Sequence, residues 1–86
     1  MPAPIHLLLP LSAFETLLRL CEPTTRVYDY LINGIIENNE YGQPQIRIFC
    51  DQRRAESIFA YAHDARPDLR SLIRVVVPGA NPSLGE

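Results

Sequence analysis

Two cysteines and two histidines are the side chains in this sequence that could support thiol or metal chemistry. They are Cys21, Cys50, His6 and His63, and no pair among them has the spacing of a zinc-binding motif. His63 follows Cys50 by about three and a half helical turns, which separates the two side chains by ~18–20 Å within one helix. A nucleophilic cysteine needs a base within hydrogen-bond distance. We therefore expect neither catalysis nor a metal site, and we interpret both cysteines as reduced, buried thiols.

Residues 45–50 carry a second chemical candidate, because Arg47 and Phe49 interrupt an apolar run that has the length of a strand. Successive side chains of a strand point to opposite faces of its sheet, so these two would face away from the core that their apolar neighbours enter. The same alternation applies to two further expected strands, at 5–9 and 72–77. It predicts additional outward side chains on the same face: His6, Leu8, Leu72, Arg74 and Val76. It predicts the following inward side chains: Ile5, Leu7, Leu9, Ile46, Ile48, Cys50, Ile73, Val75 and Val77. Three neighbouring strands would thus show basic and apolar side chains together.

Two amphipathic helices are predicted between these strands. The first begins at Ser12, which has the spacing of a capping box with Glu15, and ends by Pro23. Its apolar stripe is Phe14, Leu17, Leu18 and Cys21. Glu15 and Arg19 are expected to pair on the solvent side. The second helix begins after Asp51 as N-cap and ends before Pro67. Its apolar stripe is Ala55, Ile58, Phe59 and Ala62.

Residues 24–36 fit more than one type of secondary structure. Alternating aromatic and apolar side chains over 28–36 favour a strand. A helix that begins at Thr25 and ends at the Asn-Gly pair before residue 35 is also consistent with the sequence, and the same pair could form a tight hairpin turn. Among these alternatives we favour a long strand with a kink or bulge at Gly34. Residues 38–44 are rich in turn formers and are expected to be a loop.

The resulting order is strand, helix, strand, strand, helix, strand, which resembles the ferredoxin-like βαββαβ arrangement. This resemblance implies an α+β fold with a four-stranded antiparallel sheet in the order 4-1-3-2 and both helices on one face. The other face of the sheet would be open. We expect residues 1–78 to form a single α+β domain and 79–86 to be a loose polar tail.

The net charge and the apolar segments of the sequence limit which partners and which cellular compartment we expect. The chain of 86 residues has a net charge of −2, which excludes the broad cationic field of most nucleic-acid binders. The apolar start of the sequence lacks a basic region and a small-residue cleavage site, so we expect no signal peptide. No run approaches the roughly 18 apolar residues that span a bilayer. We expect a cytoplasmic protein without a membrane partner.

An open sheet face that carries an aromatic ring and arginines resembles the RNA recognition motif, whose exposed rings stack unpaired bases. The resemblance lies in the order of elements and the length. The third strand of that family begins basic-Gly-aromatic-Gly-aromatic, whereas residues 45–50 here have one aromatic side chain and no glycine. His6 and Leu8 stand where the first strand of the family carries a stacking ring. Single-stranded nucleic-acid binding is therefore the alternative hypothesis, and our leading hypothesis does not include nucleic acid as a partner.

The apolar content of the open face favours contact with another protein surface. Tyr41 in the 38–44 loop is a further contact candidate, whereas Glu37 and Glu40 flank the same loop and are expected to be solvated. Small oligomeric regulators of this topology, such as PII-like proteins, bind effectors in clefts between subunits. We predict a non-enzymatic, regulatory homodimer or homotrimer without a cofactor, which binds a small anionic ligand or a protein through its open face, its subunit clefts or this loop. The predicted interface residues are His6, Leu8, Arg47, Phe49, Arg74 and Val76, with Tyr41 as the loop contact.

Overall fold

The computed structural model of this chain describes residues 4–77, which form four strands and four helices. In chain order these are β1 (Ile5–Pro10), α1 (Leu11–Leu20), α2 (Arg26–Ile32), β2 (Ile35–Asn38), β3 (Pro44–Cys50), α3 (Gln52–Ala65), α4 (Pro67–Arg70) and β4 (Arg74–Val76). The strands form one antiparallel sheet in the order β2-β3-β1-β4. The predicted α+β class with a four-stranded antiparallel sheet is confirmed. The predicted tail, 79–86, lies outside the described residues.

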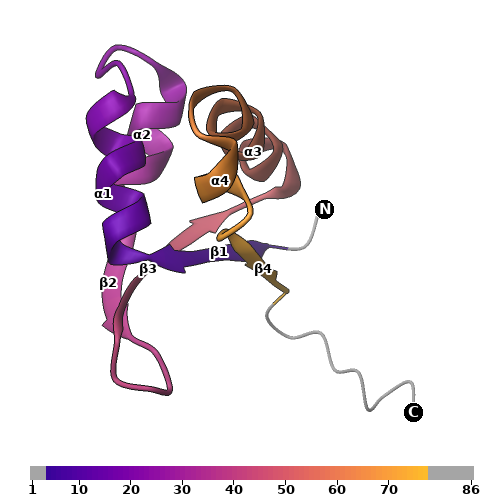
Figure 1. The fold of residues 1–86 in the computed structure, drawn as a ribbon. Helices are drawn as coiled ribbons and strands as arrows, with labels where there is room; N and C mark the ends of the chain where they lie inside the picture. The colour runs from indigo at the N-terminus through magenta and orange to yellow at the C-terminus, as the bar shows by residue number, and fades with distance from the viewer. Residues whose placement is uncertain (1–3, 78–86) are drawn as a thin grey trace.

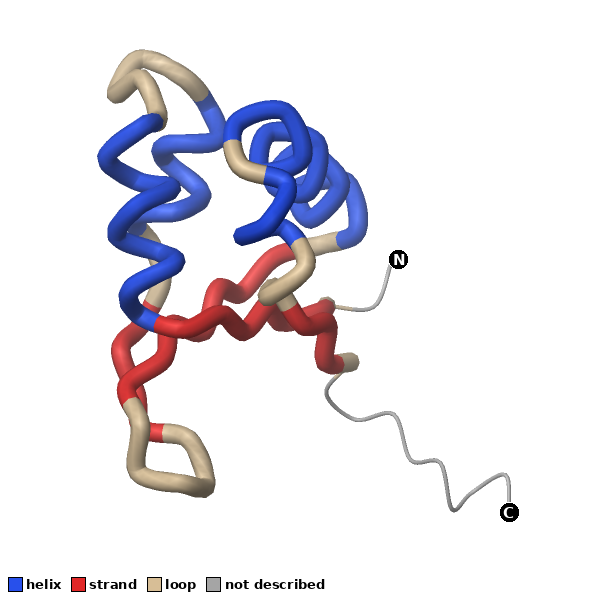
Figure 2. The backbone as a smooth tube through the Cα atoms, in the orientation of Figure 1, coloured by secondary structure: helices blue, strands red, loops and turns tan. Residues whose placement is uncertain are grey.

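The helices gather on one side of the sheet, as Figures 1 and 2 show, and the core lies between the two layers. The largest fully buried side chains come from both layers: Leu7, Leu9, Leu17, Leu31, Ile46, Ile48 and Ile58. Along β1 and β3 the alternation predicted for the core side is confirmed, because Leu7, Leu9, Ile46 and Ile48 belong to this core. The opposite face of the sheet has no helix over it within residues 4–77 (Figure 2).

The favoured long strand over 24–36 is wrong, because residues 26–32 form helix α2 and only Ile35–Asn38 is extended. The hydroxyl of Thr25 caps α2 by accepting a hydrogen bond from the backbone N–H of Tyr28 at 3.3 Å. A helix places Leu31 in the core, where its side chain is fully buried. This tertiary burial outweighs the strand-like alternation of the tyrosines. Gly34 follows α2 and packs closely against β3, since a Cβ there would lie 2.5 Å from the Ile46 side chain.

The predicted capping box of the first helix is also wrong. Helix α1 begins at Leu11, directly after β1, and Pro10 occupies the cap position without a side-chain hydrogen bond. The first turn therefore starts two residues earlier than a Ser12 cap allows, and the carbonyl of Ser12 accepts a hydrogen bond from the Thr16 hydroxyl within the helix. Glu15 forms no ion pair with Arg19 in the described part of the chain.

Helix α3 follows its prediction closely, whereas the chain after it does not. Asp51 caps α3 by accepting from the backbone N–H of Arg54 at 2.8 Å, and the helix ends before Pro67. Pro67 then starts the additional short helix α4, so β4 is three residues long instead of extending over 72–77. Val75 and Val77, predicted to be buried, are 50% and 43% exposed because β4 is an edge strand beyond the main helical cover.

Candidate functional site

The sheet register brings the six predicted interface residues together on the face away from the helices. On β1, His6 lies between Phe49 of β3 and Val76 of β4. Leu8 lies between Arg47 and Arg74 in the same way. Directly paired residues of neighbouring strands point to the same side of a sheet. We call this surface the open face and include the residues that the register adds to it from the strand β2 side: Ile35, Glu37 and Gln45.

A hydrogen-bonded chain of charged and polar groups occupies the middle of the open face. Arg47 binds the Glu37 carboxylate with two nitrogens, since Nε donates to Oε1 and Nη2 donates to Oε2, both at 2.9 Å. Gln45 Nε2 donates to the same Oε2 at 2.6 Å. The remaining guanidinium nitrogen, Nη1, lies 2.7 Å from Nδ1 of His6. We call these four residues the polar network; it joins strands β1, β2 and β3.

The polar network fixes the protonation of its members. A guanidinium is always a donor, so Nδ1 of His6 accepts and the proton of the neutral ring is on Nε2. Partial burial and the Arg47 charge lower the pKa of His6, and the Glu37 charge opposes this shift. Hydrogen bonds from Arg47 and from Gln45 lower the pKa of Glu37. The Glu37 hydrogen bond raises the pKa of Arg47. At neutral pH the network thus consists of one cation, one anion and two neutral groups.

Apolar side chains from all four strands surround the polar network. The ring of Phe49 packs edge-on against the His6 ring, with centroids 4.4 Å apart and planes at 77°. Half of the Phe49 side chain remains exposed, as do 53% of Ile35 and 36% of Val76. Leu8 is buried although it lies outside the core between helices and sheet, because neighbours on the open face cover it. The open face therefore combines internally paired charges in its middle with exposed apolar side chains, and with the exposed Arg74 on its β4 edge.

The loop between β2 and β3 extends to the same side of the sheet as the open face (Figure 1). The side chain of Asn39 orders this loop, because its Oδ1 accepts from the backbone N–H groups of Tyr41 and Gln43 at 2.8 and 2.9 Å. Gly42 supplies the positive φ of 78° that the turn requires. Tyr41, the predicted loop contact, is 79% exposed. A hollow of about 230 Å³ separates the loop from residues such as Leu8, Leu72 and Arg74.

Sequence reasoning missed three members of the open face: Ile35, Glu37 and Gln45. Glu37 was expected to be solvated, but its carboxylate accepts three hydrogen bonds. The hairpin itself contains a signal for this arrangement. Counting back from a turn centred on residue 41 pairs Glu37 with Gln45 and places Arg47 two residues further along the same face. The error over 24–36 hid this register, because a long strand gave no defined start for β2.

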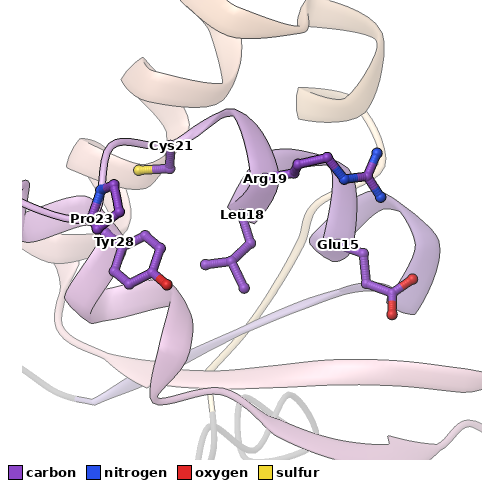
Figure 3. Close-up of a pocket in the computed structure, with 6 residues that line it drawn as sticks. All are labelled: Glu15, Leu18, Arg19, Cys21, Pro23 and Tyr28. Atoms are coloured by element: carbon purple, nitrogen blue, oxygen red, sulfur yellow. The ribbon is translucent and has the colours of Figure 1, made fainter.

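The thiols lie on the helix side, away from the open face. Cys21 is buried at the end of α1 beside a hollow of about 520 Å³, which Figure 3 shows with the lining residues Glu15, Leu18, Arg19, Cys21, Pro23 and Tyr28. Its sulfur lies 3.4 Å from the Thr25 hydroxyl. Burial and then the neighbouring Asp51 charge raise the pKa of the Cys50 thiol, which favours its protonated, unreactive form. His63 is exposed on α3.

Within residues 4–77, no group of three or more His, Cys, Asp and Glu side chains is placed to hold a metal ion. The same residues contain no helix with the length and apolar character that crossing a bilayer requires. Comparisons of the chain with protein-family models, with curated proteins and with solved structures give no match. The chemistry of the open face is therefore the basis on which we assign a function.

Proposed function

We propose that this chain is a non-enzymatic interaction module that associates with a second copy of itself through the open face. One observation carries the proposal: the charges in the middle of this face are hydrogen-bonded to one another, while Ile35, Phe49 and Val76 beside them are exposed. Exposed apolar side chains that are grouped on one surface favour contact with another protein.

The pairing of charges removes the main obstacle to burying this face. Taking an unpaired charge out of water is costly, whereas a carboxylate and a guanidinium that already satisfy each other lose less on burial. Glu37 accepts three hydrogen bonds and Arg47 directs all of its terminal nitrogens to network partners. The apolar side chains around them supply the favourable free energy of association. A small anion is a poorer candidate ligand, because Glu37 already fills the bidentate site of Arg47.

The dimensions of the molecule are compatible with this mode of association. Stable protein interfaces remove about 800 Å² of accessible surface from each partner. That area is about one seventh of the 5790 Å² surface of this chain. A twofold contact would bury the same patch of both copies, so that Phe49 and Val76 of each copy would lie against the open face of the other. We therefore propose a homodimer as the simplest assembly.

We also propose that the architecture is a variant of the ferredoxin-like fold. The order β2-β3-β1-β4 is the 4-1-3-2 order viewed from the other edge of the sheet, and α1 and α3 stand at the two crossovers. Helix α2 would then be an addition before β2, and α4 an addition before β4. In this architecture one face of the sheet is left without helices, and that is the face on which the proposed interface lies.

One observation favours single-stranded nucleic-acid binding as the second candidate. His6 and Phe49 are neighbouring rings on the two central strands, and RNA recognition motifs place stacking rings on their central strands. The net charge of −2 and the engagement of Arg47 by Glu37 oppose this function. For these two reasons we place nucleic-acid binding second to self-association.

The proposal is tested by the solution mass of Phe49→Asp, measured by light scattering at two protein concentrations. We expect the wild type to move from monomer toward dimer as concentration rises, and Phe49→Asp to stay monomeric because a new charge in the contact has no partner. Leu20→Asp is the matched control, since Leu20 is 52% exposed at the end of α1, distant from the open face. It should associate like the wild type. A folded Phe49→Asp variant that dimerises normally would refute the proposed surface.

The nucleic-acid alternative has a separate measurement. Fluorescence anisotropy with labelled single-stranded oligonucleotides would be followed while salt is raised. Binding that weakens steeply with salt indicates phosphate contacts. Such binding by a monomeric wild type, with loss in Phe49→Ala, would replace self-association as the assigned function.

A further inference from the structure

We propose that His6 makes this self-association pH-dependent, because protonation of its Nδ1 atom releases Arg47 and separates the two copies. This inference rests on the proposed function and adds a regulatory device to the same surface. The device consists of the imidazole, the Arg47 guanidinium and the Phe49 ring, which lie in contact on strands β1 and β3.

The contact between His6 and Arg47 exists in only one protonation state. Nδ1 of His6 lies 2.7 Å from Nη1 of Arg47, and the guanidinium has no acceptor atom. A protonated Nδ1 has no lone pair to accept the hydrogen bond, and it would place two cations at that distance. The imidazole must then turn away or draw in water. It packs against Phe49 in a T-shaped contact, with ring centroids 4.4 Å apart, so this movement disturbs the apolar part of the interface.

Charge on the open face changes in the same direction. The charged groups that face His6 are Arg47 on β3, Glu37 on β2 and, diagonally across the register, Arg74 on β4. Glu40 of the β2–β3 loop lines the hollow at the Gln45 end of the face. With His6 neutral, Arg47 and Glu37 balance; with His6 protonated, one positive charge is left over and Arg74 adds to it. In a twofold contact the positively charged open faces of the two copies would meet, and an uncompensated charge is costly to bury.

The pH range of the device follows from its neighbours. The pKa of His6 lies below the ordinary histidine value of 6.5 because of burial and Arg47. Glu37 stays ionised over this range, since hydrogen bonds from Arg47 and Gln45 lower its pKa below the ordinary 4.5. The neutral imidazole is the associating form. Association is therefore strongest above about pH 6.5 and weakens as the pH falls.

The test measures the dimer dissociation constant by sedimentation equilibrium at about pH 7.5 and about pH 5. For the wild type we expect the constant to rise at least ~10-fold at the lower pH, because two histidines per dimer must lose their protons on association. His6→Asn keeps an amide oxygen that can accept from Arg47 but does not titrate. Whatever its affinity at neutral pH, its dissociation constant should change less than ~2-fold between the two conditions. His63→Asn, which removes the other histidine, should follow the wild type.

Different failures of this test have different meanings. A wild-type dimer of equal affinity at both pH values would overturn the switch and leave the proposed function standing. Acid dissociation that persists in His6→Asn would overturn the assignment to His6. A wild type that stays monomeric at neutral pH up to high concentration would overturn both. Far-UV circular dichroism at the lower pH separates dissociation from acid unfolding, and dissociation that occurs only with loss of the helical signal would overturn the switch.

Discussion

The side chains on the two sides of strand β3 are held in place by different kinds of interaction. Ile46 and Ile48 on the helix side are 1% exposed and belong to the apolar core. Arg47 and Phe49 on the open face alternate with them along the same strand, yet they are partly exposed and held by directional hydrogen bonds and ring packing. The helix side is specified by volume, and the open face by the matching of charges. Changes on the two sides should therefore have different kinds of effect.

The largest difference is expected for the stability of the fold. Ile48→Ala removes a fully buried side chain, which should lower the free energy of unfolding by about 2–5 kcal/mol. Phe49→Ala removes more atoms from the open face, but half of that side chain is exposed, so the loss should be less than half as large. Urea denaturation at low protein concentration measures both. Equal losses for the two variants would show that the open face belongs to the core of the monomer.

A smaller effect on the helix side tests how closely its parts fit. Gly34→Ala places a methyl group against the Ile46 side chain, and the overpacking should cost about 1–3 kcal/mol. Gly42→Ala is a useful comparison, because a Cβ there has no atom within 4 Å and the cost comes only from its positive φ. The two urea midpoints separate crowding from backbone strain. If Gly34→Ala leaves stability unchanged, β2 has more freedom than this packing allows.

The smallest effect concerns the response of the monomer to acid. Folding lowers the pKa of His6, so the folded state binds this proton less tightly than the unfolded chain. The contribution of His6 to the free energy of unfolding is therefore fully present above about pH 6.5 and is lost as the pH falls below that value. Folding also lowers the pKa of Glu37, whose contribution is present above about pH 4.5 and lost below it. The urea concentration at the midpoint of unfolding, measured from neutral to acid pH, should decrease in each of these two pH ranges.

Two substitutions that each remove one positive charge show which residues cause this acid response. Arg47→Gln removes the largest cause of the Glu37 shift, so the change near pH 4.5 should flatten. It also removes the cause of the His6 shift that ranks after burial, so the change near pH 6.5 should become smaller. Arg66→Gln breaks the more exposed Arg66–Asp68 pair, which lowers the pKa of the Asp68 carboxyl group and involves no histidine, so the change near pH 6.5 should remain. An Arg66→Gln variant that loses this change would place its origin outside the polar network.

Local signals in the sequence were enough for β1, β3 and α3. Alternation along two central strands predicted Leu7 and Ile48 inside and Arg47 outside, and Asp51 marked the start of α3. Residues 24–36 were different, because their side chains satisfy two periods at once. Burial of Leu31 against other elements decides between helix and strand there, and a single sequence does not contain that contact.

The polar network depends on long-range pairing in the same way. Arg47 is 10 residues from Glu37 and 41 residues from His6, so its partners are known only when the register of three strands is known. The sequence did predict that His6 and Arg47 share a face. It did not predict that Glu37 pairs with Arg47 on that face, and this pairing favours a protein surface over a small anion, both of which the sequence left open.

The short outer strands β2 and β4, of four and three residues, bear on the size of the assembly. Joining the edge of one molecule to the opposite edge of the next would be a repeating contact without an end, which builds fibrils. Edges this short offer few backbone groups for such growth. A contact between the open faces of two molecules leaves neither face available to a third molecule. The arrangement of strands therefore favours a closed dimer over a polymer.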